Sequence, residues 1–243
     1  MERKIALITG ASRGIGHAIA EAFAKGGYDL ILTCLNNYNR LEEYAQSLSF
    51  ENNIVCRAYQ IDHSSAADVN ALFDSIEEDF GRVDVLINNA GISYIGLITD
   101  MSIENWRDVM STNLDSLFYT SRKVIPMMLQ NGSGSIINIS SIWGSTGASM
   151  EVAYSASKGG VNAFTRALAK ELAPSHIAVN AIACGLIDTD MNNHLTKEEM
   201  DAVIAEIPAD RIGTPEEVAK VAFSLASLPS YLTGQIIGVD GAW

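Results

Sequence analysis

The sequence predicts a single α/β domain, residues 1–243, in which helices cover both faces of a doubly wound, seven-stranded parallel sheet. Short apolar runs recur along the chain with helical patterns between them, which is typical of parallel strands buried on both faces. A glycine-rich turn joins the first run to the first helix. The 243 residues are 48% hydrophobic and 19% charged, which is enough apolar material for one large core.

Seven apolar runs are the expected strands. In chain order they are residues 5–9, 30–34, 54–61, 83–87, 135–141, 177–182 and 236–239. Helical spacing and capping residues predict helices over residues 14–25, 39–49, 65–80, 103–129, 154–173 and 197–206, and a last one that begins at Thr214-Pro215. Asn113 falls inside the fourth of these helices, where asparagine is a poor helix former.

Two connections differ from ordinary turns. Residues 143–150 are mostly small, and we expect them to form a flexible loop. Residues 188–212 are polar and longer than most connections in a compact domain. Segments of this kind often close over a binding site, so we expect a flexible substrate lid here.

The composition argues against some classes of partner. The formal net charge of −13 disfavours binding to nucleic acid or to an anionic membrane surface. The three cysteines are far apart without metal-ligand spacing, which favours reduced thiols. The first residues show no signal-peptide pattern, and no run approaches the length of a membrane span. We therefore expect a cytoplasmic protein that binds neither nucleic acid nor membranes.

The glycine-rich turn after the first strand reads Gly10-Ala11-Ser12-Arg13-Gly14-Ile15-Gly16. Between a strand and a helix, the backbone N–H groups of such a turn and the helix N-terminus bind phosphate. The turn therefore predicts a dinucleotide site. Three glycines also occur in tight turns that have a purely structural role.

The end of the second strand bears on the choice of dinucleotide. Enzymes that use NAD place a carboxylate there to bind the ribose 2′-hydroxyl. Cys34, Leu35 and Asn36 are all neutral. Arg13, or alternatively Arg40, could meet a 2′-phosphate instead, so the sequence favours NADP(H). An arginine in a loop is as often a solvated surface cation.

Tyr154 and Lys158 lie four residues apart at the start of an expected helix, so their side chains share one face. An ammonium beside a phenol lowers the pKa of the tyrosine, which can then exchange a proton with a substrate oxygen. A surface tyrosine packed on a lysine stem has the same spacing. Ser141, at the end of the fifth strand, favours the catalytic interpretation, because ligands bind at the carboxyl ends of parallel strands.

Together these motifs resemble those of the short-chain dehydrogenase/reductase family, which has a Rossmann fold. The resemblance covers nearly the whole chain and rests on residues 9–16, Asn88-Asn89-Ala90-Gly91, Asn113, Ser141, Tyr154 and Lys158. It implies that the last four are a catalytic tetrad. Tyr154 would be the general acid, and Lys158 would lower its pKa and hold the nicotinamide ribose. Ser141 would hydrogen-bond the substrate oxygen, and Asn113 would support a water that connects Lys158 to solvent.

The resemblance also implies an NADP(H) site along the same edge of the sheet. The phosphates would lie on the glycine-rich turn, the adenine near Asp62 and the nicotinamide near Ile187 and Thr189. The implied cofactor-binding residues are Gly10, Ser12, Arg13, Gly14, Ile15, Asn36, Asp62, Asn89, Ala90, Gly91, Tyr154, Lys158, Ile187 and Thr189.

Within the family, the sequence is most similar to bacterial 3-oxoacyl-[acyl-carrier-protein] reductases of fatty-acid synthesis. The similarity lies in Thr112-Asn113-Leu114, residues 188–191 and Thr233-Gly234-Gln235. It implies reduction of a carrier-bound ketone by NADPH, with an acyl carrier protein as partner. Docking of that acidic partner would need cations, for which Arg122, Lys123 and Arg166 are candidates, although they fit a solvated face equally well. The family also implies a homotetramer, with helices 103–129 and 151–173 as its main interface.

Two positions depart from that pattern. Cys184-Gly185 stands where the family usually has Pro-Gly, so the backbone near the nicotinamide is less constrained. Trp143 is bulky for a site that admits an acyl arm, unless it is only a pocket wall. With Gly147-Ala148-Ser149 and Trp243, it resembles the related reductase that acts on the 5-aminopentanone modification of elongation factor P. That substrate, or another small ketone, is the alternative.

Other classes fit the sequence less well. A dinucleotide-binding regulator without activity would be expected to have lost one of the tetrad residues. An NAD-dependent oxidising dehydrogenase would be expected to carry a carboxylate after the second strand. No metal site is expected, because no spacing suited to a metal or a nucleophilic triad relates the histidines His17, His63, His176 and His194.

Overall fold

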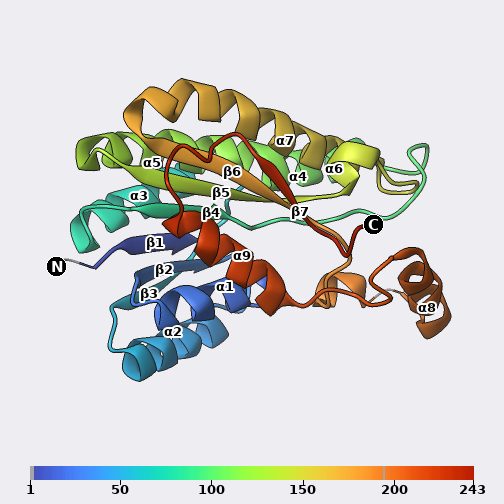
Figure 1. Ribbon diagram of the computed structural model, residues 1–243, viewed down its shortest axis with the longest axis horizontal. Coiled ribbons are helices and arrows are strands. Elements are labelled where there is room, and N and C mark those ends of the chain that lie inside the picture. The colour runs from blue at the N-terminus through green and yellow to red at the C-terminus, as the bar shows by residue number, and fades with distance from the viewer. Residues whose placement is uncertain (1–2, 194) are drawn as a thin grey trace.

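The seven expected strands form one parallel sheet in the order β3-β2-β1-β4-β5-β6-β7 (Figure 1). The computed structural model describes residues 3–193 and 195–243, so His194 lies outside the described residues. The strands are β1 Ile5–Ile8, β2 Asp29–Cys34, β3 Cys56–Gln60, β4 Val85–Asn88, β5 Gly134–Ser141, β6 Ile177–Cys184 and β7 Ile236–Val239. The order of winding reverses between β1 and β4, where a doubly wound sheet opens a crevice at its carboxyl edge. The doubly wound fold is therefore confirmed.

Helices lie on both faces of the sheet. The helices of the described residues are α1 Gly14–Lys25, α2 Tyr38–Asn52, α3 Ala66–Asp79, α4 Ile103–Met110, α5 Ser116–Asn131, α6 Trp143–Thr146, α7 Val152–Leu172, α8 Lys197–Glu206 and α9 Pro215–Ser227, of which α8 lies beyond the edge of the sheet. Short 3₁₀ turns occupy Ala173–Ser175 and Asp190–Asn192. None of the helices in the described part of the chain is both long and apolar enough to cross a membrane.

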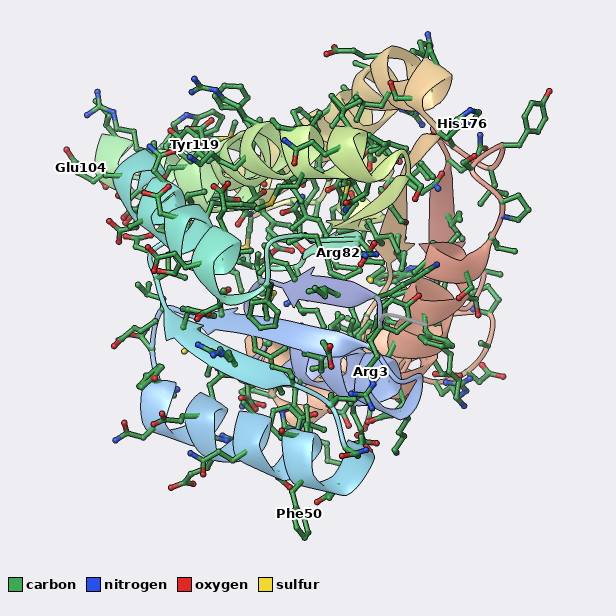
Figure 2. All side chains as sticks on the ribbon, turned by 90° about the vertical axis from the view of Figure 1, so that its left-hand side faces the viewer. Arg3, Phe50, Arg82, Glu104, Tyr119 and His176 are labelled. Atoms are coloured by element: carbon green, nitrogen blue, oxygen red, sulfur yellow. The ribbon has the colours of Figure 1, made fainter. Side chains whose placement is uncertain are left out.

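Each face of the sheet has its own buried apolar cluster. On one face, Phe23 of α1 and Ala222 of α9 belong to the same cluster, together with side chains of α2. On the other face, α3, α5 and α7 contribute Phe73, Met128 and Leu172. Figure 2 shows the sheet between these layers, with the exposed Phe50 projecting from the outer side of α2. The carboxyl edge of the sheet is left for the site.

The helix expected over residues 103–129 is interrupted. α4 ends at Met110, residues Ser111–Asp115 form one π-helical turn, and α5 begins at Ser116. The wider turn leaves the Asn113 side chain completely buried, where its amide bonds the backbone N–H and C=O of Ile92 at 2.8 Å each. The apolar pattern could not reveal this turn, because helix continues on both sides of it.

Two other boundaries also differ from the prediction. The segment expected as a flexible loop begins with the short helix α6, and α7 begins at Val152 instead of Tyr154. Tyr154 therefore lies inside the first turn of α7, whose preceding residue is Glu151.

A buried polar network joins the sheet to the helices on the face of α5 and α7. Asn88 of β4 donates a hydrogen bond from Nδ2 to Asn138 Oδ1 at 2.9 Å. Asn138 of β5 in turn donates to Thr165 Oγ1 of α7 at 2.9 Å, and Thr120 Oγ1 of α5 donates to Asn88 Oδ1 at 2.7 Å. Because hydrogen bonds are directional, this network sets the register between strands and helices, which apolar packing alone does not fix.

Asn138→Ala is expected to lower the free energy of unfolding by about 2 to 3 kcal/mol, because Asn88 Nδ2 loses its acceptor inside the core. Urea unfolding followed by circular dichroism measures this change. The control is Asn70→Ala, an exposed asparagine of α3, which is expected to stay within about 0.5 kcal/mol of the wild type. A similarly small change for Asn138→Ala would show that the network does not hold the register.

Candidate active site

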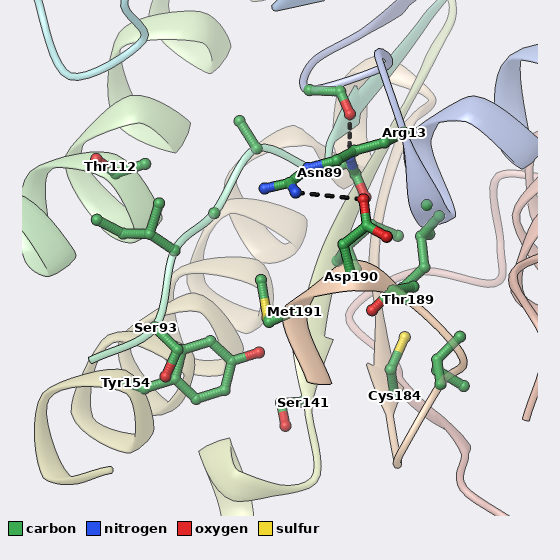
Figure 3. Close-up of a pocket in the computed structure, with 18 of the residues that line it drawn as sticks. Arg13, Asn89, Ser93, Thr112, Ser141, Tyr154, Cys184, Thr189, Asp190 and Met191 are labelled. Atoms are coloured by element: carbon green, nitrogen blue, oxygen red, sulfur yellow. Dashed lines mark hydrogen bonds and ion pairs between the residues drawn. The ribbon is translucent and has the colours of Figure 1, made fainter. Parts of the chain in front are cut away.

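The carboxyl ends of the strands open into a cavity of about 770 Å³ (Figure 3). The cavity brings together the glycine-rich turn, the ends of β2, β4, β5 and β6, and the first turn of α7. The expected site residues that line it are Gly10, Ser12, Arg13, Gly14, Ile15, Asn36, Asp62, Asn89, Ala90, Gly91, Ser141, Tyr154, Lys158, Ile187 and Thr189. Asn113 lies behind this wall, and Arg40 is not among the lining residues.

The backbone of the glycine-rich turn suits a bound phosphate. Gly10 and Gly14 have φ angles of +66° and +57°, which favour glycine. A Cβ on Gly16 would lie 2.4 Å from the carbonyl oxygen of Gly10, so this close approach requires glycine too. No side chain caps the N-terminus of α1, and its first turn carries no acidic residue. The first N–H groups of α1 are therefore left to an anion.

Asn89 has a bracing role beside this turn. Its Nδ2 donates to the carbonyl oxygens of Thr9 at 2.9 Å and Gly10 at 3.0 Å. Thr9 Oγ1 accepts from the backbone N–H of Asn89 at 2.9 Å and of Ala90 at 3.0 Å. Asn89 thus lines the cavity, but its amide N–H groups are engaged by the turn, which leaves its carbonyl oxygen and the nearby backbone for a ligand.

Arg13 reaches from the glycine-rich turn to Asp190. Its Nη1 lies 3.3 Å from Asp190 Oδ2, and the two side chains are 63% and 54% exposed, so this ion pair is weak. Thr189 lies next to the turn as well, since a Cβ on Gly14 would be 3.2 Å from Thr189 Cγ2. Arg13 can therefore exchange Asp190 for another anion at small cost.

The four residues of the expected tetrad come from three elements. Ser141 ends β5, and its Oγ accepts from the backbone N–H of Trp143 at 3.2 Å. Lys158 of α7 donates from Nζ to the carbonyl oxygen of Ile139 at 2.9 Å, and Nζ lies 5.5 Å from the centroid of the Tyr154 ring. Asn113, in the π turn, reaches the same helix because its Nδ2 donates to Ser157 Oγ at 3.0 Å.

The protonation of Tyr154 and Lys158 is controlled by burial. Desolvation raises the pKa of the Tyr154 phenol above its usual value; Cys184 and Glu151 add to the increase, and Ser141 opposes it. Desolvation lowers the pKa of Lys158 to about 8, against a small opposing effect of Cys184. The net shift of the Tyr154 pKa is therefore opposite in direction to the expected lowering, because desolvation of the buried phenol dominates it. Lys158 Nζ meanwhile donates to the carbonyl oxygen of Ile139.

Sequence reasoning missed Ser93 and Glu151 as residues of the cavity, and it missed the contact between Trp143 and Trp243. Ser93 Oγ donates to Glu151 Oε1 at 2.5 Å beside Tyr154. Trp143 and Trp243 meet edge to face, with ring centroids 4.9 Å apart, although they lie a hundred residues apart in sequence. Glu151 could have been noticed as a carboxylate three residues before Tyr154, one helical turn away. Nothing in the sequence pattern indicates that Ser93 bonds to Glu151 or that Trp143 contacts Trp243.

The comparisons with known proteins agree with this geometry. The family model described as short chain dehydrogenase matches residues 4–200. The chain therefore belongs to the short-chain dehydrogenase family of oxidoreductases.

Individual relatives match over nearly the whole length. An uncharacterized oxidoreductase of Bacillus subtilis, YmfI, is 42% identical over 99% of this chain and 98% of its own length. The 3-oxoacyl-[acyl-carrier-protein] reductase FabG of Vibrio cholerae is 39% identical over 99% of this chain and 97% of its own. A crystal structure from Beutenbergia cavernae, provisionally described as an NAD(P)-dependent gluconate 5-dehydrogenase with bound NADP at low occupancy, has a TM-score of 0.92. It is 34% identical and covers 99% of this chain and 96% of its own.

Lys158→Met is expected to raise the free energy of unfolding at pH 7, because the wild-type fold desolvates an ammonium. Between pH about 8 and 10.5 the unfolded wild type binds more protons than the native state, so wild-type stability rises with pH there. The advantage of the variant should therefore be smaller at pH 10 than at pH 7. Urea unfolding at both pH values measures it, and Lys170→Met on the exposed end of α7 is the control. An equal effect at both pH values would contradict the shifted pKa.

Proposed function

We propose that this chain is an NADP(H)-dependent reductase that transfers hydride to a ketone, with Tyr154 as the general acid. The observation that carries the proposal is one cavity lined at one end by Ser141, Tyr154 and Lys158 and at the other by a turn suited to phosphate. The FabG relatives and the NADP-bound structural neighbour support the same reaction class.

The residues present fit a dinucleotide phosphate. The glycine-rich turn and the free N–H groups of α1 would hold the pyrophosphate, and Arg13 would leave Asp190 for the 2′-phosphate. Asn36 and Asp62 would border the adenosine end, and Ile187 and Thr189 the nicotinamide end. When bound, the reduced nicotinamide supplies the hydride.

The protein's own residues account for the proton. Burial keeps the Tyr154 phenol protonated, as a proton donor requires, and Tyr154 gives that proton to the ketone oxygen as negative charge develops there. Ser141 donates a hydrogen bond to the same oxygen. Lys158 holds the nicotinamide ribose and, while protonated, stabilises the tyrosinate that is left. Asn113 fixes the Ile92 segment against α7 and supports the water that reprotonates this pair.

For the substrate, we propose a 3-oxoacyl-[acyl-carrier-protein] first, because FabG relatives match over the whole chain at 37% to 39% identity. The docking cations on α5 are only partly available to a carrier protein, since Lys123 lies 4.0 Å from Asp74. The second candidate is the 5-aminopentanone group on elongation factor P, or another small ketone. The contact between Trp143 and Trp243 favours it, because both bulky rings line the cavity that an acyl arm would have to share with them.

We also infer a homotetramer that works in the cytoplasm. Apolar side chains stand exposed along α4 and α5, on the surface expected to be the main interface: Ile103, Trp106, Phe118 and Leu129. The three cysteines are all unpaired, which suits a reducing compartment. Residues 188–212 would act as the lid, since Met191, Leu195 and Val203 line the cavity.

Tyr154→Phe is expected to lower ketone reduction at least about 1,000-fold and leave NADPH binding nearly unchanged, because it removes only the proton donor. Absorbance at the NADPH band measures turnover with two substrates, an acetoacetyl thioester of the carrier protein and a small amino-ketone. Fluorescence titration measures NADPH binding. The substrate that the wild type turns over faster decides between the two candidates, and turnover retained by Tyr154→Phe would remove Tyr154 as the acid.

Arg13→Ala is expected to weaken NADPH binding about tenfold or more and to leave NADH binding nearly unchanged, because only NADPH carries the 2′-phosphate. Asp190→Asn is the matched variant on the other side of the ion pair, and it should tighten NADPH binding by removing a competitor for Arg13. Calorimetric titration of both dinucleotides compares them. An equal loss for NADPH and NADH in Arg13→Ala would refute the assignment.

A further inference from the structure

We propose that Glu151 is a specificity-determining residue that selects ketones carrying a positively charged group near the carbonyl. The proposal rests on the ketone reductase activity proposed above and names the substrate class of the same site. Glu151 directly precedes α7, lines the cavity, and lies three residues before the proton donor Tyr154.

The carboxylate of Glu151 is held in one orientation. Ser93 Oγ donates to Oε1 at 2.5 Å, which is a short hydrogen bond. The two segments are also joined through the backbone, because the N–H of Gly96 donates to the carbonyl oxygen of Met150 at 2.8 Å. Figure 3 shows Ser93 and Tyr154 on the same side of the cavity. Oε2 has no hydrogen-bond partner in the described part of the chain, so it is available to a ligand.

No cation of the cavity wall neutralises this carboxylate. The cationic side chains among the described lining residues are Arg13 and Lys158. Arg13 pairs with Asp190, and Lys158 donates to the carbonyl oxygen of Ile139. None of the ion pairs between described residues includes Glu151. A half-buried carboxylate beside the reacting ketone therefore lacks its counter-ion, and a substrate can supply it.

Stabilisation of α7 by Glu151 explains this geometry less well than binding of a cationic group does. A carboxylate before a helix does stabilise the helix dipole. Glu151, however, makes no side-chain bond to the free N–H groups of α7 and accepts from Ser93 instead.

The rest of the cavity fits the same chemistry. Trp143 and Trp243 line it as an aromatic pair, and aromatic faces attract cations. Asp62, Asp108 and Asp190 contribute further carboxylates to the lining, of which Asp190 pairs with Arg13. The net charge of −13 attracts a cation from solution and repels an anionic arm. Between the two substrate candidates, Glu151 thus favours the amino-ketone class over a carrier-bound acyl chain.

The test uses two ketones of matched shape, a methyl ketone with a dimethylammonium end and its isopropyl isostere. A tertiary ammonium keeps one N–H donor for Oε2 and cannot cyclise onto the ketone. We expect wild-type kcat/KM to be about tenfold higher for the cation. This factor corresponds to the free energy of one hydrogen bond to a charged group. Glu151→Gln should bring the ratio close to one, mainly through KM for the cation. Glu216→Gln, an exposed acid in the first turn of α9, should keep the wild-type ratio.

Binding without turnover separates this proposal from the reductase proposal. Calorimetric titration of the two ketones into the full chain loaded with NADP⁺ reports affinity when no hydride is available. A preference of about tenfold for the cation that Glu151→Gln abolishes supports the subsite, even if neither ketone is reduced. Equal affinity of the wild type for both ketones overturns it, even if both are reduced by NADPH. A preference that survives in Glu151→Gln also overturns it.

Discussion

The position of Tyr154 against Ser141 depends on buried polar contacts between β5 and α7. Ser140 Oγ donates to Asn162 Oδ1 at 2.7 Å, and one residue away Lys158 Nζ donates to the carbonyl oxygen of Ile139 at 2.9 Å. Apolar packing is non-directional and would allow α7 to slide on the sheet. Hydrogen bonds are directional and do not allow this, so they hold Tyr154 and Ser141 at one separation, which the proposed catalysis needs to within about 1 Å.

The sequence predicted the sheet well because its strands are buried on both faces. The runs of residues 5–8 and 85–87 are fully buried in the structure, and burial of that kind leaves a continuous apolar signal. The π turn at Ser111–Asp115 left no such signal. Its extra width changes which way Asn113 points, but it does not change the residue types on either side.

In the candidate site as well, the sequence predicted where residues lie but not the environment that surrounds them. Spacing placed Tyr154 and Lys158 on one helical face, and topology brought Ser141 to them. The sign of the tyrosine pKa shift depends instead on burial and on where the Lys158 ammonium points, and neither is encoded in a spacing. The pairing of Ser93 with Glu151 likewise depends on how the segment after β4 packs on α7, which sequence separation conceals.

An acidic chain that binds a dinucleotide must solve two electrostatic problems of opposite sign. The field of the net charge of −13 acts over about a Debye length, whereas backbone N–H groups act only at contact. Phosphate can therefore be held at the glycine-rich turn and Arg13 despite the overall charge, because the favourable contacts are local. At the other end of the cavity, the charge of Glu151 has the same sign as the net charge of the chain. The local and the long-range electrostatic effects therefore both favour a cationic ligand. The two ends of one cavity are in this way suited to an anion and to a cation.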